Sequence, residues 1–157
     1  MCIRDSSHIE EVVYPVEAPN GIGLSPDGSR LYVAETHTGR VRVWDVAGPG
    51  RLDSAYGKAT RGRLLAGLEG EQLLDSLAVD SADHVCVATI RNGGITDVAP
   101  DGTVTHTPSG DTITTNICFG GEELTTAYVT GSLNGTCLLY TSPSPRDATL
   151  SRMPSSA

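Results

Sequence analysis

The chain has 157 residues, and its 19 Asp and Glu outnumber its 11 Lys and Arg, which gives a net charge of −8 at pH 7. This acidity argues against nucleic acid or an anionic membrane as a partner, because both attract clustered positive charge. No run is long and apolar enough to span a bilayer as a helix. The four cysteines do not indicate a disulfide framework, so we expect a reduced, cytoplasmic protein.

Short apolar runs separated by turn residues begin after Pro19 and predict antiparallel strands. Asp27-Gly28, between two such runs, is a strong hairpin signal because Gly accepts the positive φ of a tight turn. We expect a loop over Pro49–Lys58. The strands predicted for this first repeat are Asn20–Ser25, Arg30–Glu35, Gly39–Val46 and Arg63–Leu68.

The same plan of strand, turn and strand restarts twice. The second repeat contains the hairpin turn Asn92-Gly93-Gly94 and a further Pro-Asp-Gly turn at Pro100. The strands predicted for the second repeat are Ser76–Val79, Val85–Ile90, Ile95–Ala99 and Val104–Thr107. Those of the third are Asn116–Phe119 and Thr126–Thr130.

A polar side chain stands at the start of the first strand of each repeat, at Asn20, Asp75 and Asn116. The spacings are close to the roughly 40–50 residues of a propeller blade, which has about four strands. The fold class is therefore all-β, and we predict about two and a half blades of a β-propeller. A β-sandwich also uses short strands with regular turns and is the alternative architecture.

The two ends of the chain have an unusual relationship. A nucleotide word that encodes Met1–Asp5 encodes Cys137–Thr141 on its opposite strand and resembles a sequencing adapter. We therefore expect residues 1–6 and 137–157 to be adapter-derived, with the partial propeller over residues 7–136. On this hypothesis the two ends lack packed contacts with the blades.

Three motifs together resemble the gluconolactonase, regucalcin (senescence marker protein) and luciferin-regenerating enzyme family of six-bladed β-propellers. The resemblance covers most of residues 13–132. The motifs are Pro19-Asn20-Gly21 followed by Ser25-Pro26-Asp27-Gly28, then Leu74-Asp75-Ser76-Leu77-Ala78-Val79-Asp80, and then Thr115-Asn116-Ile117-Cys118-Phe119-Gly120-Gly121.

The resemblance implies a divalent metal in the central channel, with Asn20 and Asp75 as ligands. Oxygen ligands of this kind suit Ca²⁺ best, with Mg²⁺, Mn²⁺ or Zn²⁺ as alternatives. The implied activity is hydrolysis of a small sugar lactone, with Asp75 also as general base. Asn116 is a weaker candidate for lining the channel. Family members usually have Pro-Asp-Gly around the second ligand, where this chain has Leu74-Asp75-Ser76.

A further metal ligand of the family, a Glu from the first blade, lies upstream of this sequence. We therefore expect the chain by itself to be inactive. We also expect it to be prone to aggregate, because an open propeller leaves apolar blade faces and edge strands uncovered. The alternative function is a non-catalytic binding scaffold that resembles the NHL-type propellers, since propellers serve both purposes. Without the resemblance, Asn20 reads as a turn residue in the left-handed conformation and Asp75 as a solvated or capping carboxylate.

Overall fold

The structure is a computed structural model that describes residues 9–53, 62–121 and 124–141. The described residues form twelve strands and no helix, so nothing in them could cross a membrane as a helix. The strands are β1 (Pro19–Leu24), β2 (Arg30–Glu35), β3 (Arg40–Gly48), β4 (Arg51–Leu52), β5 (Arg63–Gly67), β6 (Leu74–Val79), β7 (Val85–Thr89), β8 (Gly94–Val98), β9 (Val104–Pro108), β10 (Thr114–Gly120), β11 (Thr126–Gly131) and β12 (Thr136–Thr141).

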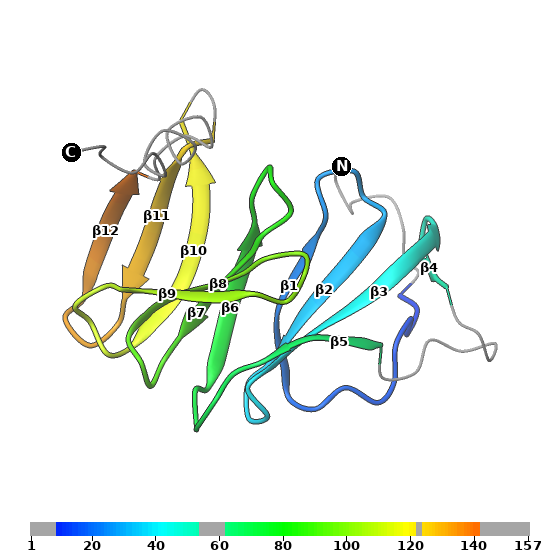
Figure 1. Cartoon of the computed structure of the whole chain (residues 1–157), viewed down its shortest axis with the longest axis horizontal. Coiled ribbons are helices and arrows are strands. Elements are labelled where there is room, and N and C mark those ends of the chain that lie inside the picture. Colours follow the sequence, from blue (N-terminus) through cyan, green and yellow to red (C-terminus); the bar gives the residue numbers. More distant parts are fainter. Residues whose placement is uncertain (1–8, 54–61, 122–123, 142–157) are drawn as a thin grey trace, which may run out of the picture.

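The strands form three antiparallel sheets that follow one another along the chain (Figure 1). The first sheet has the order β1-β2-β3, with both β4 and β5 paired to β3, and the second has the order β6-β7-β8-β9. The third has the order β10-β11-β12. Each sheet is one propeller blade, with its earliest strand innermost, so the all-β propeller prediction is confirmed.

Each expected strand is present, with ends that differ by at most two residues. Two segments differ from the prediction. The expected loop over Pro49–Lys58 contains the short strand β4, which pairs with the end of β3. The expectation that residues 137–157 lack packed contacts is wrong for Cys137–Thr141. These residues lie in β12, pair with β11 along its whole length, and place Leu138 against the core.

The formation of β12 has a simple physical reason. Leu138 is the one half-buried residue of β12 and packs against the apolar cluster, and the edge of β11 pairs with β12 along its length. Residues 1–6 and 142–157 of the predicted ends lie outside the described residues. The third sheet therefore has three strands, one more than the sequence predicted.

The core lies between the sheets. Tyr32, Val41 and Val43 of the first sheet pack with Val85 and Val87 of the second, all almost completely buried. In β3 the buried Val41 and Val43 flank the less buried Arg42, whereas every residue of β7 is buried.

A second apolar cluster joins the second sheet to the third. Cys86 of β7 packs against Ile117 of β10 and Ala127 and Val129 of β11. The middle sheet is therefore covered on both faces. Cys86 is a buried free thiol, and burial raises its pKa. It serves as a small apolar core residue.

Candidate functional site

The first strand of the first sheet contains a β-bulge at the predicted motif. Pro19 pairs with Glu35 and Ile22 pairs with Val33, so Asn20 and Gly21 together oppose one residue of β2. A bulge of this kind turns the side chain of its extra residue away from the regular alternation. Asn20 lies within the strand and does not have a positive φ, which removes its interpretation as a left-handed turn residue.

The second sheet repeats this irregularity at the same place. Leu74 pairs with Thr89 and Leu77 pairs with Val87, so Asp75 and Ser76 together oppose one residue of β7. Asp75 is therefore the structural equivalent of Asn20. The amide and the carboxylate occupy the same position in neighbouring blades.

In the third sheet the residue equivalent to Asn20 and Asp75 is not Asn116, as the sequence predicted, but the residue before it. Thr114 pairs with Gly131 and Asn116 pairs with Thr130, so the extra residue of the bulge is Thr115. Thr115 takes the position of Asn20 and Asp75, and Asn116 follows it. The Asn116 Oδ1 accepts a hydrogen bond of 2.8 Å from the backbone N–H of Ile117.

The backbone enters the first two bulges in the same strained conformation. Ala18 and Leu73, two residues before Asn20 and Asp75, have φ values of 42° and 51°. A residue with a Cβ in this region costs about 1–2 kcal/mol. Both carbonyls accept equivalent hydrogen bonds, at 3.0 Å from Thr36 N–H and 3.2 Å from Ile90 N–H. Strain that recurs beside two aligned polar residues is typical of a functional site.

Gly21 brings the two bulges into direct contact. A Cβ at Gly21 would lie 2.7 Å from the Asp75 carbonyl oxygen and 2.7 Å from the Leu77 nitrogen. Only glycine permits so close an approach of two backbones. The motif around Asn20 and the motif around Asp75 are therefore packed against each other, although they are far apart in sequence.

Neither candidate side chain is held by another group. Asn20 is exposed and Asp75 is half-buried, and within the described part of the chain no hydrogen bond or ion pair engages either side chain. This argues against a capping role for Asp75. Their oxygens are hard donors of the kind that bind Ca²⁺ or Mg²⁺. Among the described residues no three His, Cys, Asp or Glu side chains gather to hold a metal. Asn20 and Asp75 are therefore two candidate oxygen ligands without a third of these residue types beside them in the described part of the chain.

Glu35 lies beside the first bulge and is held firmly. It is 3% exposed, and it accepts hydrogen bonds from Thr38 Oγ1 at 2.6 Å and Arg42 Nε at 3.0 Å. Burial raises its pKa, but these donors and the Glu17 N–H outweigh burial and hold the pKa below its ordinary value. Glu35 fixes the turn between β2 and β3, which is a structural role.

Asp111 has a similar structural role in the third sheet, where it accepts hydrogen bonds from backbone N–H groups. This residue was not identified by the sequence analysis. It is 1% exposed and accepts from the backbone N–H groups of Ile113 and Asn134, each at 2.8 Å, and of Leu133 at 3.3 Å. Burial raises its pKa, and the backbone donors reverse this and keep the pKa low. An acidic residue just before a predicted inner strand was the available signal.

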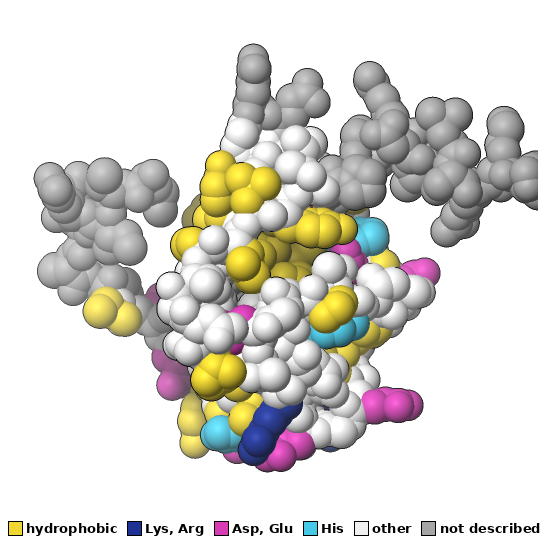
Figure 2. All heavy atoms as spheres, turned by 90° about the vertical axis from the view of Figure 1, so that its left-hand side faces the viewer, with side chains coloured by type: hydrophobic (Ala, Val, Ile, Leu, Met, Phe, Trp, Pro, Cys, Tyr) yellow, Lys and Arg dark blue, Asp and Glu magenta, His cyan; other side chains and the backbone are white. Residues whose placement is uncertain are grey.

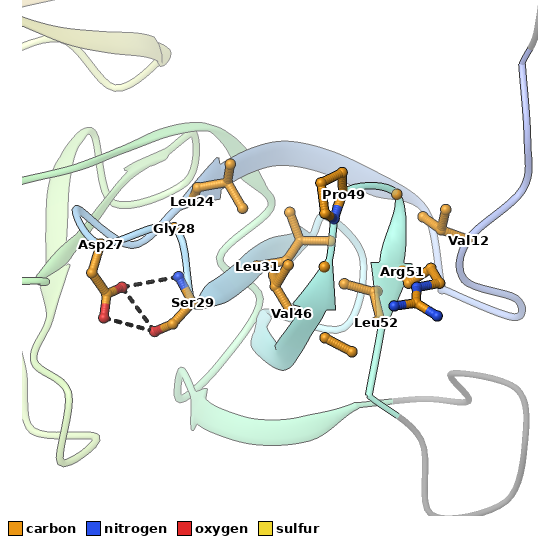
Figure 3. A pocket seen from close by; sticks show the side chains of 13 residues that line it. Val12, Leu24, Asp27, Gly28, Ser29, Leu31, Val46, Pro49, Arg51 and Leu52 are labelled. Carbon is orange, nitrogen blue, oxygen red and sulfur yellow. Dashed lines mark hydrogen bonds between the residues drawn. The ribbon is translucent and has the colours of Figure 1, made fainter.

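A cavity of about 600 Å³ lies where β1 ends, at Leu24 and the turn that follows it (Figure 3). Leu24, Leu31 and Leu52 contribute apolar walls to it. At its rim the Asp27 carboxylate accepts hydrogen bonds from the hydroxyls of Ser25 and Ser29 and from the Ser29 N–H, which lower its pKa to about 2. This cavity belongs to the outer face of the first sheet and is remote from the paired bulges.

Known proteins resemble this chain in sequence. The model of the SMP-30/gluconolactonase/LRE-like region matches residues 1–132. The pentonolactonase XacC of Haloferax volcanii is 32% identical over 117 residues, which are 73% of this chain and 38% of that protein. The chain therefore spans well under half of that relative's length.

Solved structures have the same fold. A gluconolactonase of Xanthomonas campestris superposes with a TM-score of 0.62 at 24% identity, over 81% of this chain and 38% of that one. Regucalcin of Agrobacterium tumefaciens, a calcium-binding protein, superposes with a TM-score of 0.62 at 22% identity, over 71% of this chain and 37% of that one. The chain that contains these paired bulges belongs to the SMP-30, gluconolactonase and luciferin-regenerating enzyme-like family.

Proposed function

We propose that the protein of which this sequence is a part is a metal-dependent hydrolase of small sugar lactones. The observation that carries the proposal is the pair of equivalent bulges, which place the free side chains of Asn20 and Asp75 on neighbouring inner strands. The relatives named as a pentonolactonase and a gluconolactonase support the same chemistry.

The residues fit a divalent ion in kind but do not complete its coordination. The Asn20 Oδ1 and an Asp75 carboxylate oxygen would hold it, and further ligands would come from outside the described residues. When bound, the ion supplies a Lewis acid that polarises the lactone carbonyl and stabilises negative charge on its oxygen. Ca²⁺ is the ion we propose first, since the donors are hard oxygens.

Asp75 has a second task in this proposal. One carboxylate oxygen accepts a proton from water, whose oxygen then bonds to the carbonyl carbon of the lactone. The ring C–O bond breaks, and the ring oxygen takes up a proton to give the open-chain hydroxy acid. Because this chain spans 38% of the pentonolactonase, we expect the isolated chain to lack activity.

The test is lactone hydrolysis by a full-length protein that contains this sequence, with and without added Ca²⁺. Asp75→Asn should preserve the fold and lower kcat at least about a hundredfold, because an amide cannot accept the proton. Asp45→Asn, which changes an exposed carboxylate on β3, is the control and should leave the rate unchanged. An unchanged rate in Asp75→Asn would refute the assignment. A full-length protein without lactonase activity would favour the non-catalytic scaffold.

A further inference from the structure

The third sheet has a hydroxyl at the position where the first two sheets have their candidate metal ligands. Thr115 occupies the bulge of β10, as Asn20 occupies that of β1 and Asp75 that of β6. β10 lies against β6 as β6 lies against β1, so the three residues lie on consecutive inner strands (Figure 1). A polar residue at this position in a third sheet extends the candidate site beyond its two oxygen ligands.

The residue opposite the bulge also differs in the third sheet. In the strand registers the bulges of β1 and β6 oppose Ala34 and Ala88, which are completely buried and have no polar side-chain atom. The bulge of β10 opposes Thr130, and the hydroxyl oxygens of Thr115 and Thr130 lie 2.9 Å apart. The third sheet therefore has a pair of hydrogen-bonded hydroxyls where the other two have a free side chain opposite an alanine.

The threonine pair keeps hydrogen-bonding capacity for a further group. Each hydroxyl has one hydrogen and two acceptor lone pairs, and the bond between the two uses one hydrogen and one lone pair. Within the described part of the chain the two hydroxyls bond only to each other. One O–H and several lone pairs therefore remain, so the pair can donate to one polar group and accept from another.

The position of Thr115 remains accessible in a sheet that is covered on both faces. The second sheet has neighbours on both sides, and there Asp75 is still only half-buried while Ala88 is completely buried. Figure 2 looks onto the outer side of the third sheet and shows apolar side chains among uncharged ones. A sheet packed on this side would bury Thr130, as Ala88 is buried, and would leave Thr115 open as Asp75 is.

The third bulge differs from the first two in ways that argue against a third metal ligand. Ca²⁺ is bound mainly by carboxylate, carbonyl and amide oxygens, whereas the Thr115 hydroxyl is neutral and already hydrogen-bonded. The residue two positions before the bulge differs as well, because Ile113 lacks the positive φ of Ala18 and Leu73. Its N–H donates instead to the Asp111 carboxylate at 2.8 Å. The third bulge is therefore suited to a different contact.

We propose that the Thr115 hydroxyl binds a ring hydroxyl of the lactone and that Thr130 positions it. The assignment rests on the proposed function, in which the lactone carbonyl lies at Asn20 and Asp75. A sugar lactone is larger than the ion, so its ring extends from the carbonyl over the neighbouring inner strands, one of which is β10. A site that hydrogen-bonds a substrate hydroxyl discriminates against the analogue that lacks it. Thr115 therefore selects lactones that carry hydroxyls over unsubstituted ones.

The test compares two lactones in a full-length protein that contains this sequence. D-glucono-δ-lactone carries ring hydroxyls, and δ-valerolactone has the same ring without substituents. Thr115→Val keeps the shape of the side chain and removes its hydroxyl. It should lower kcat/KM about tenfold for D-glucono-δ-lactone and leave the value for δ-valerolactone unchanged. Where hydrolysis of δ-valerolactone is slow, its inhibition constant against the first lactone replaces the rate.

Two variants serve as matched comparisons for Thr115→Val. Thr115→Ser keeps a hydroxyl at the same position and should retain the preference for D-glucono-δ-lactone. Thr105→Val makes the same change at an exposed threonine of the outer strand β9 and should alter neither value. A loss in Thr105→Val equal to that in Thr115→Val would overturn the assignment.

The positioning role of Thr130 has a separate readout. Thr130→Val leaves the Thr115 hydroxyl without its partner, so KM for D-glucono-δ-lactone should rise about threefold while kcat is unchanged. Thr130→Ser should restore KM. Calorimetric titration should give the same Ca²⁺ affinity for Thr115→Val, Thr130→Val and the unmodified protein, because neither threonine holds the ion.

The possible failures can be told apart. Equal losses for the two lactones in Thr115→Val would overturn the assignment, since a general structural defect affects both substrates. A fall in Ca²⁺ affinity would overturn it as well and make Thr115 a ligand. If Asp75→Asn abolishes hydrolysis but Thr115→Val leaves the ratio of the two lactones unchanged, the role of Thr115 is refuted and the proposed function stands. Retained hydrolysis in Asp75→Asn would refute both.

Discussion

The phenolic oxygen of Tyr32, in the first sheet, hydrogen-bonds to the two carboxylate oxygens of Asp83, in the turn before β7, at 2.9 and 3.0 Å. Arg30 contacts the same carboxylate at 2.5 Å. Tyr32 is completely buried, and burial together with the bond to Asp83 raises its pKa to about 12. The hydroxyl therefore stays protonated at neutral pH and joins two blades through one polar contact.

Tyr32→Phe should lower the free energy of unfolding by about 1.5 kcal/mol, because it removes a hydrogen bond to a charged group while keeping the ring in the core. Urea denaturation of the whole chain measures this. Tyr14→Phe removes a hydroxyl from a residue that is 71% exposed and should have no measurable effect. Equal effects of the two variants would contradict a specific role for the contact.

Gly21→Ala should destabilise the chain by about 1–3 kcal/mol, since the added Cβ would overlap the backbone of β6. Gly67→Ala, also in a strand, places its Cβ in open space and should be close to neutral. The two denaturation midpoints, compared in one buffer, check the prediction. Because Gly21 contacts the backbone of Asp75, the same variant should also weaken metal binding in a longer protein.

Asn20→Ala should weaken Ca²⁺ binding at least about tenfold in a full-length protein that contains this sequence, because it removes one oxygen ligand. Asn116→Ala should leave the affinity unchanged, because the Asn116 oxygen is engaged by the N–H of Ile117. Calorimetric titration with Ca²⁺ gives both values. A loss with Asn116→Ala and none with Asn20→Ala would place the site in the third sheet.

The lowered pKa of Asp27 leads to a prediction about the stability of the chain in acid. Its pKa is lowered from 3.8 to about 2 by hydrogen bonds, first from Ser25 and then from Ser29. A depressed folded-state pKa contributes stability that is present above the unfolded value and is lost as the pH falls through the folded value. The stabilisation from Asp27 should therefore disappear between about pH 4 and pH 2.

Asp27→Asn should flatten the pH dependence of unfolding over that interval, and Asp45→Asn serves as the control with the same change of charge. Glu35 and Asp111 also have lowered pKa values, whereas burial raises that of Asp97, so the comparison must be between variants. Identical slopes for Asp27→Asn and the unmodified chain would show that the turn gains nothing from its carboxylate.

Much of the fold follows from local sequence signals. Turn dipeptides such as Asp27-Gly28 place the strand ends, and the alternation of apolar residues tells which face is buried. The equivalent positions of Asn20 and Asp75 in neighbouring sheets could be predicted from matching motifs. These signals are local, so they are readable without the rest of the molecule.

The features that sequence reasoning missed depend on contacts between distant segments. The bulge of the third sheet makes Thr115, and not Asn116, the counterpart of Asp75, and only strand pairing fixes that register. The strand β12 forms because β11 offers it an unpaired edge. Asp111 accepts hydrogen bonds from the backbone N–H groups of Leu133 and Asn134, more than twenty residues away, and no local sequence pattern predicts contacts over this separation.

The middle blade has a consequence for how the chain opens. All five residues of β7 are buried, with sheets on both sides, whereas the strands of the third sheet have at most one covered face. Amide hydrogens of Val85–Thr89 should therefore exchange with solvent most slowly, and those of β12 among the fastest. Loss of an outer blade would leave this strand protected, so the protein should come apart from its two ends toward its centre.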